Sequence, residues 1–128
     1  MKSTGQKILF IVQGEGRGHM TQAITAYDIL TSNAFNVCAV MIGCSSNREV
    51  PEFFYKQISA PIVKFKSPNF ITDKKNKSIK VLHSIISNFA LLSVFRQSMK
   101  LIKYQIRKHQ PDLILNFYDP LIGICIYL

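Results

Sequence analysis

The feature that most constrains this chain is an apolar run that ends in a cluster of glycines. Residues 7–13 read KILFIVQ, and residues 14–19 read GEGRGH. A short, continuous run rich in Ile and Val and bounded by glycines is typical of a strand buried on both faces. The apolar spacing in residues 20–32 then predicts a helix, with Asn33 as its stop. This segment therefore predicts a strand, a glycine loop and a helix in succession.

The alternation of strand and helix continues along the chain. Further apolar strands are predicted at 36–42, 61–65 and 112–117, and a short helix opened by proline at 51–58. One bent helix or two are expected over 78–109, before Pro111, and a final helix from Pro120 with Asp119 as its N-cap. Apolar strands alternating with helices predict an open, mostly parallel, Rossmann-like α/β sheet with helices on both faces.

Composition fits part of one soluble domain. The chain has 128 residues, of which 48% are hydrophobic, enough for a core. Its three cysteines form no CxxC pair, which favours reduced thiols in a cytosolic protein over a disulfide framework or a metal site. No apolar stretch reaches the ~20 residues that a membrane span needs. The last residues, LIGICIYL, contain no helix stop, so we expect a chain cut inside an element.

The charge is strongly basic, with 16 Lys and Arg against 7 Asp and Glu, a net charge of +9. A positive field favours anionic partners, although no nucleic-acid-binding motif is present and nucleic acid is an unlikely partner. Four basic residues are spaced to share one helical face: Arg96, Lys100, Lys103 and Arg107. Such a face either docks on anionic lipid or is the solvated outside of a helix that packs on the sheet. Four lysines precede it, at 74, 75, 77 and 80.

The glycine loop between strand and helix predicts a site for an anion. Backbone N–H groups and the helix dipole meet there, and glycine permits both close approach and positive φ. The spacing of Gly14, Gly16 and Gly18 departs from the dinucleotide fingerprint G-x-G-x-x-G, and no acidic residue ends the second strand. The P-loop pattern fails because no lysine follows the last glycine. We therefore expect no nicotinamide, flavin or other cofactor.

Residues 8–24, ILFIVQGEGRGHMTQAI, resemble the start of glycosyltransferases of the GT-B fold. That group includes the bacterial enzyme that makes lipid II, the monogalactosyldiacylglycerol synthases and the UDP-glucuronosyl- and glucosyltransferases. Residues 111–124, PDLILNFYDPLIGI, resemble a later segment of the same N-terminal domain. The resemblance implies that residues 1–128 are a partial acceptor-side domain. It also implies that a separate donor-binding domain completes the enzyme, so that this piece alone is inactive.

The resemblance gives His19 the position that serves as the catalytic base in several inverting members. An imidazole titrates near neutral pH and suits this role, whereas the alternative is a capping or packing histidine. Asp119 is the second catalytic candidate because it follows a strand at the carboxyl edge of the sheet, although it can equally be a plain N-cap. We expect His83 and His109 to be structural, since a cation suits the end of a helix at His109.

The same loop supplies the predicted contacts to substrate. The glycine N–H groups can hold departing phosphates, Arg17 can reach a phosphate, and Glu15 can face the acceptor. The full set of predicted substrate or phosphate contacts is Gly14, Glu15, Gly16, Arg17, Gly18, Met20 and Thr21.

Three functions remain open from the sequence. The first is sugar transfer from a nucleotide-sugar donor to an acceptor hydroxyl, with the acceptor a sugar or a lipid-linked molecule. The second is a non-catalytic, membrane-recruiting subunit of a split transferase, and the third is a basic domain that binds anions or nucleic acid. The first two predict a cytoplasmic protein, peripheral at the inner face of the membrane.

Overall fold

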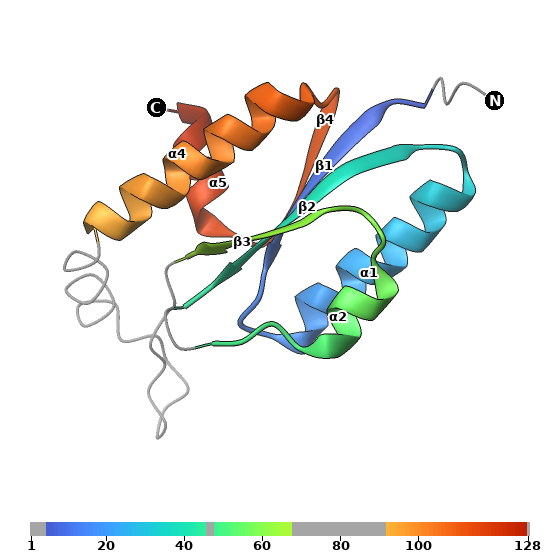
Figure 1. Cartoon of the computed structure of the whole chain (residues 1–128), viewed down its shortest axis with the longest axis horizontal. Helices are drawn as coiled ribbons and strands as arrows, with labels where there is room; N and C mark the ends of the chain where they lie inside the picture. Colours follow the sequence, from blue (N-terminus) through green and yellow to red (C-terminus); the bar gives the residue numbers. More distant parts are fainter. Residues whose placement is uncertain (1–4, 46–47, 68–91, 128) are drawn as a thin grey trace.

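The computed structural model describes residues 5–45, 48–67 and 92–127. Within them the chain forms β1 (Lys7–Gln13), α1 (Arg17–Ser32), β2 (Asn36–Cys44), α2 (Glu52–Gln57), β3 (Ile62–Lys66), α4 (Leu92–His109), β4 (Leu113–Phe117) and α5 (Pro120–Tyr127). The strands pair in parallel in the order β3-β2-β1-β4. The predicted open α/β sheet of the Rossmann-like kind is thus confirmed (Figure 1).

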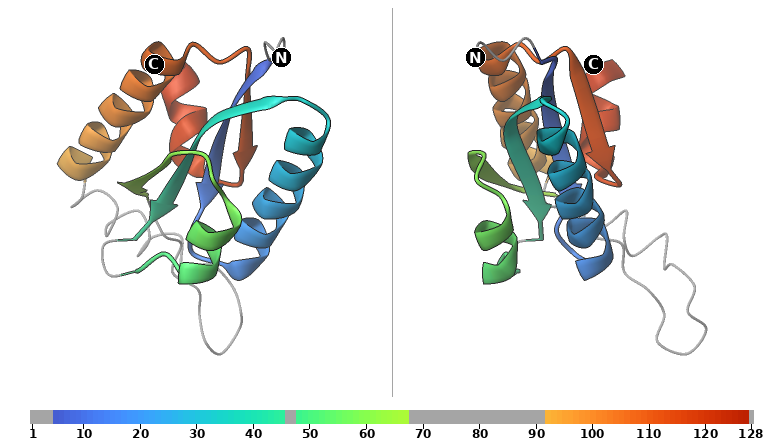
Figure 2. Two further views of the ribbon diagram at one scale, coloured as in Figure 1. Left: turned by 45° about the vertical axis from the view of Figure 1, so that its right-hand side comes forward. Right: turned by 90° about the vertical axis from the view of Figure 1, so that its right-hand side faces the viewer.

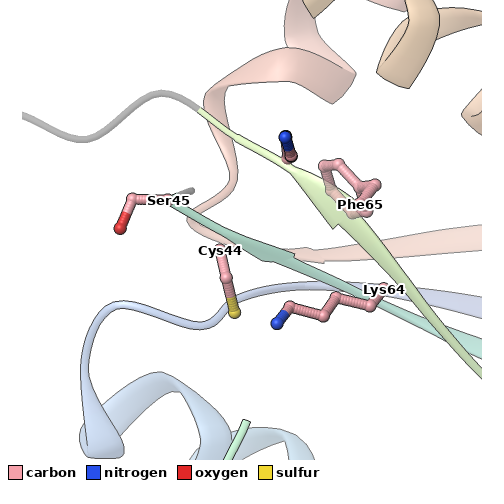
Figure 3. Close-up of a pocket in the computed structure, with 5 residues that line it drawn as sticks. Cys44, Ser45, Lys64 and Phe65 are labelled. Atoms are coloured by element: carbon pink, nitrogen blue, oxygen red, sulfur yellow. The ribbon is translucent and has the colours of Figure 1, made fainter. Parts of the chain in front are cut away.

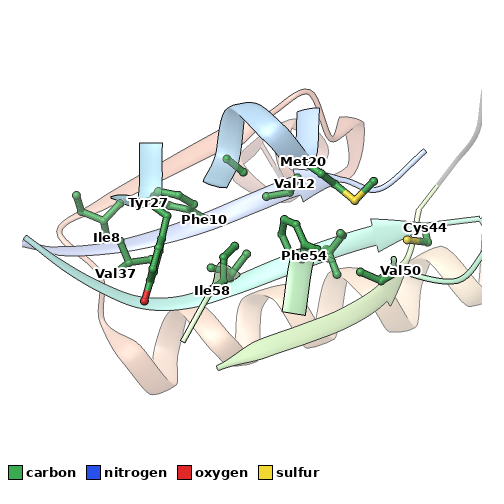
Figure 4. Packing of buried hydrophobic residues seen from close by; sticks show 13 residues of the cluster. Ile8, Phe10, Val12, Met20, Tyr27, Val37, Cys44, Val50, Phe54 and Ile58 are labelled. Atoms are coloured by element: carbon green, nitrogen blue, oxygen red, sulfur yellow. The ribbon is translucent and has the colours of Figure 1, made fainter. Parts of the chain in front are cut away.

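Helices cover both faces of the sheet, with α1 and α2 on one side and α4 and α5 on the other (Figure 2). Alternate residues of β1 serve the two layers. Ile8, Phe10 and Val12 pack with α1 and α2, whereas Leu9 and Ile11 pack toward α4 and α5. Figure 4 shows the first of these clusters between the sheet and its two helices. Neither face of a strand buried on both sides contacts solvent, which is why residues 8–12 are all apolar.

Two boundaries near the glycines differ from the prediction. Helix α1 begins at Arg17 rather than at Met20, so Gly18 and His19 lie in its first turn. Strand β2 continues through Gly43 to Cys44, although Gly43 was predicted to close it. A Cβ atom on Gly43 would come within 2.8 Å of the Phe65 ring and also meet the Asp119 carboxylate. Gly43 is therefore a packing glycine within the strand and does not form a turn.

The remaining helix boundaries follow the predicted signals closely. Asn33 ends α1, and its side-chain amide donates to the Ile29 carbonyl at 2.7 Å. Pro51 precedes α2 at the N-cap, so it is not the first helical residue. Helix α4 ends at His109, as predicted. Of the expected helical region 78–109, the part before Leu92 lies outside the described residues, with His83 and the lysines at 74, 75, 77 and 80.

Candidate functional site

The loops after β1 and β4 meet at the carboxyl edge of the sheet. Strand β1 pairs with β2 on one side and with β4 on the other, so the strand order reverses beside β1. In open α/β sheets, ligands bind in the crevice outside the carboxyl ends of strands at such a switch point. Residues 14–19 follow β1, and Tyr118 and Asp119 follow β4. The fold therefore brings the glycine loop and Asp119 to one edge.

The three glycines of the loop have different surroundings, and none has a positive φ. The N–H of Gly14 donates to the Gly43 carbonyl at 2.7 Å, and a Cβ atom there would collide with the Cys44 thiol. Gly14 is therefore a packing residue, and its N–H is not free for a phosphate. Gly16 is the N-cap of α1 in an extended conformation, and a Cβ atom on Gly18 would meet nothing within 4 Å.

The N-terminus of α1 has unused backbone donors. Within the described residues, no side chain caps it, and no acidic residue lies in its first turn. Arg17 and Gly18 are exposed there. The first N–H groups of a helix lack intrahelical partners and carry the positive end of the dipole, so this end of α1 favours an anion.

Met20 and Thr21, two other predicted substrate contacts, both lie in α1. Met20 is fully buried in the core between the sheet and helices α1 and α2, so it does not line the edge of the sheet. The Thr21 hydroxyl donates back to the Arg17 carbonyl at 2.9 Å. This bond lies within the helix, and Thr21 is otherwise exposed.

Glu15 turns toward the end of β2. Its carboxylate accepts from the backbone N–H of Ser45 and lies 3.9 Å from the Arg48 guanidinium. Glu15 is thus engaged in joining the loop after β1 to the loop after β2. This arrangement also accounts for a carboxylate so close to an anion-favouring helix end, because its charge is directed at Arg48 and a backbone donor.

The imidazole of His19 lies against the ring of Tyr118. The two ring centroids are 4.6 Å apart, and the planes are tilted by 32°. His19 is partly buried, and its Nδ1 atom is buried with no hydrogen-bond partner among the described residues.

Asp119 is almost wholly buried, at 2% exposure, and its carboxylate is fully engaged. One oxygen accepts from the Leu121 N–H at 2.9 Å, which makes Asp119 the N-cap of α5 as predicted. The other accepts from the Ser67 hydroxyl at 2.6 Å. Desolvation by burial raises the pKa of Asp119, and the bonds from Ser67 and from backbone N–H groups oppose this only in part. The described structure brings Asp119 to the edge without a hydrogen bond to His19.

Ser67 and Tyr118 also belong to this edge and were missed by the sequence analysis. Ser67 lies 52 residues from Asp119 in the chain, so no local pattern links them. Tyr118 adopts a φ of 64°, which a sequence gives no reason to expect of a tyrosine. The role of Asn116 was predictable from the sequence. An asparagine three residues before an N-cap can form side-chain hydrogen bonds with the backbone of that residue across the turn.

A second feature of the edge is a cavity of about 300 Å³ near the ends of β2 and β3. It is lined by Cys44, Ser45, Lys64, Phe65 and Lys66. Figure 3 shows Cys44 and Lys64 leaving one side of the strands, while the Phe65 ring leaves the other. The Lys64 ammonium donates to the Arg48 carbonyl at 2.9 Å, and burial raises the pKa of the Cys44 thiol. All three cysteines of the chain are free.

The four predicted basic residues lie on one side of α4. Arg96, Lys100 and Arg107 are exposed and Lys103 is half-buried. The residues of α4 that are buried against the rest of the protein come from the opposite side: Phe95, Ser98, Ile102 and Gln105. The basic face is thus the outer surface of a helix that packs on the sheet.

Neither a membrane-spanning helix nor a cluster of metal ligands is found among the described residues. No helix among them has the length and apolar character to cross a bilayer. No group of three or more His, Cys, Asp or Glu side chains in the same residues is arranged to hold a metal ion.

Comparisons of the chain with protein-family models, with curated proteins and with solved structures find no significant match.

Proposed function

We propose that this chain is the acceptor-side part of a GT-B glycosyltransferase, which acts with a donor-binding domain. The observation that carries the proposal is the place of His19, in the first turn of α1 at the switch point between β1 and β4. The resemblance of residues 8–24 and 111–124 to this group concerns the two loops that meet there. The proposal thus joins a sequence resemblance to a ligand-binding edge.

The reaction makes two demands that this edge suits. An acceptor oxygen forms a bond to the anomeric carbon of the sugar and gives up its proton to a general base. The bond from that carbon to the diphosphate breaks, and the diphosphate takes the electron pair. The N-terminus of α1 offers free N–H groups to the departing diphosphate, with Arg17 beside them. His19 lies in the first turn of α1 beside these groups, where it can contact the acceptor or the diphosphate.

Calorimetry with UDP and with UDP-sugars tests the proposal. The chain should bind UDP more tightly than uridine, because the diphosphate makes the contacts. Replacing Arg17→Gln should weaken UDP binding about fivefold, the equivalent of ~1 kcal/mol for a charge at a helix terminus. Arg107→Gln is the matched control, since it removes the same charge from the other layer and should leave the affinity unchanged. Equal effects of the two changes would contradict the proposal.

We also propose that the outer face of α4 docks on an anionic membrane, which would make the protein peripheral at the inner, cytoplasmic face. The support is the exposure of Arg96, Lys100 and Arg107 on one side of the helix. Leu92 and Tyr104, which are 41% and 57% exposed, add apolar surface to the same helix. Basic side chains beside exposed apolar ones are the combination that interfacial helices use.

A further inference from the structure

Tyr118 has a backbone conformation that is unfavourable for its side chain. Its φ is 64°, in the left-handed region, although a bulky side chain is rarely found there. The residue is also 70% exposed, so burial of its ring does not explain the conformation. Strained residues of this kind persist only where neighbouring structure determines them, and they cluster at functional sites.

The neighbours of Tyr118 hold it in place from both sides. The Asn116 side chain accepts from the Asp119 N–H and donates to the Asp119 carbonyl, both at 2.9 Å. The Asp119 carboxylate is itself fixed by Ser67 and by the first turn of α5. Tyr118 is the residue enclosed between these anchored positions, so its backbone conformation is imposed by the turn.

The consequence of this turn is the placement of the Tyr118 ring on His19. Their centroids lie 4.6 Å apart, within the range of stacked aromatic pairs. Gly16 lies near the imidazole as well, because a Cβ atom built on it would stand 3.9 Å from His19 Cδ2. The Nδ1 atom of the ring is buried, with no partner among the described residues.

We propose that Tyr118 is a positioning residue that holds the His19 imidazole with Nδ1 covered and Nε2 toward the ligand. A proton on a buried Nδ1 would be a donor without an acceptor, and buried donors without partners are rarer in folded proteins than buried acceptors without partners. The neutral ring therefore carries its proton on Nε2. His19 then donates a hydrogen bond from Nε2 to an oxygen of the acceptor or of the diphosphate. A ring with this tautomer is not the base that the resemblance predicts, because Nε2 carries a proton and Nδ1 is covered. The donor role rests on the proposed function, whereas the stacking and the tautomer do not.

The test uses NMR spectra of the histidine rings in the whole 128-residue chain at about pH 8.5, two units above the ordinary histidine pKa. The His19 signals are the ones that His19→Gln removes. The proposal expects the Nε2–H tautomer and a ring-current shift of the His19 ring protons caused by Tyr118. Tyr118→Phe should keep that shift, and Tyr118→Ala should abolish it. Tyr104→Ala, at an exposed tyrosine of α4, should leave it unchanged.

The variants separate positioning from loss of fold. Tyr118→Gly removes the ring yet accepts a positive φ, so it decides the question if Tyr118→Ala does not fold. A wild-type ring with its proton on Nδ1, or a ring-proton shift that survives in Tyr118→Gly, would overturn the proposal. Neither the tautomer measurement nor the ring-shift measurement uses a nucleotide or a sugar. A failure of UDP binding would therefore contradict the proposed contact between the N-terminus of α1 and the diphosphate, and it would leave the result on Tyr118 unchanged.

Discussion

Burial of Asp119 disfavours the ionised form of its carboxyl group. Burial raises its pKa above the ordinary value for an aspartate, so the folded protein binds this proton more tightly than the unfolded chain does. The free energy of unfolding that Asp119 contributes is therefore greatest below about pH 3.8. It falls as the pH rises through the raised pKa of the folded state and is constant above it.

Asp119→Asn should abolish this pH dependence. Across the window above pH 3.8, the stability of the variant relative to wild type should rise with pH, by at most about 1.4 kcal/mol per unit. Urea unfolding of both proteins between pH 3.5 and 7 measures the difference. Asp28→Asn, on the exposed side of α1, is the control and should show no such trend. A constant difference between Asp119→Asn and wild type would contradict the pKa direction.

The glycines allow a second test at the residue scale. Gly18→Ala should stabilise the protein by roughly 0.5–1 kcal/mol, since alanine favours a helix and its Cβ atom meets nothing within 4 Å. Gly14→Ala should destabilise it by roughly 1–3 kcal/mol, because its Cβ atom collides with the Cys44 thiol. Urea unfolding at pH 7 measures both. Equal stabilities of the two variants would show that packing does not distinguish these glycines.

Single residues show where sequence reasoning works. The capping role of Asp119 was predictable, because a cap and its helix are adjacent in the chain. The bond from Ser67 was not, since it crosses 52 positions and depends on β2 and β3 being placed first. The three glycines of residues 14–18 look alike in sequence. The close approach of Gly14 to the Cys44 thiol depends on the pairing of β1 with β2, which no local pattern shows.

At the scale of elements, α4 combines two roles on two faces. One face packs on the sheet through Phe95 and Ile102, and the other presents the basic residues. The spacing of charges along the sequence was enough to predict the basic face. The start of α1 was not predictable to the residue, because Gly18 is a poor helix former and the helix nevertheless extends through it.

The membrane proposal predicts how α4 behaves with lipid. The chain should sediment with vesicles of phosphatidylcholine and phosphatidylglycerol at low salt. Changing Arg96, Lys100 and Arg107 together to Gln should reduce binding about 100-fold, from ~1 kcal/mol per charge near an anionic surface. Changing Lys56, Lys64 and Lys66 to Gln alters the net charge equally and is the control. Equal losses in the two variants, or no binding by wild type, would contradict the proposal.

At the scale of the whole molecule, the sheet order decides where a ligand can bind. The fold class followed from the sequence because strand segments buried on both faces are apolar, as residues 8–12 of β1 are. The order β3-β2-β1-β4 comes from pairing between strands that are distant in the chain, and β1 pairs with β4 across more than half of it. Only that pairing brings the glycine loop beside Tyr118 and Asp119.

The most direct measurement is an amide NMR titration of the ¹⁵N-labelled chain with UDP. We expect the shifts to concentrate at residues 16–19, at the N-terminus of α1, and at residues 118–119, after β4. Shifts confined to Lys64 and Lys66 at the cavity, or spread along the basic face of α4, would place the anion elsewhere. Either pattern, or no shift at residues 16–19, would contradict the claim that the N-terminus of α1 and His19 form the ligand site.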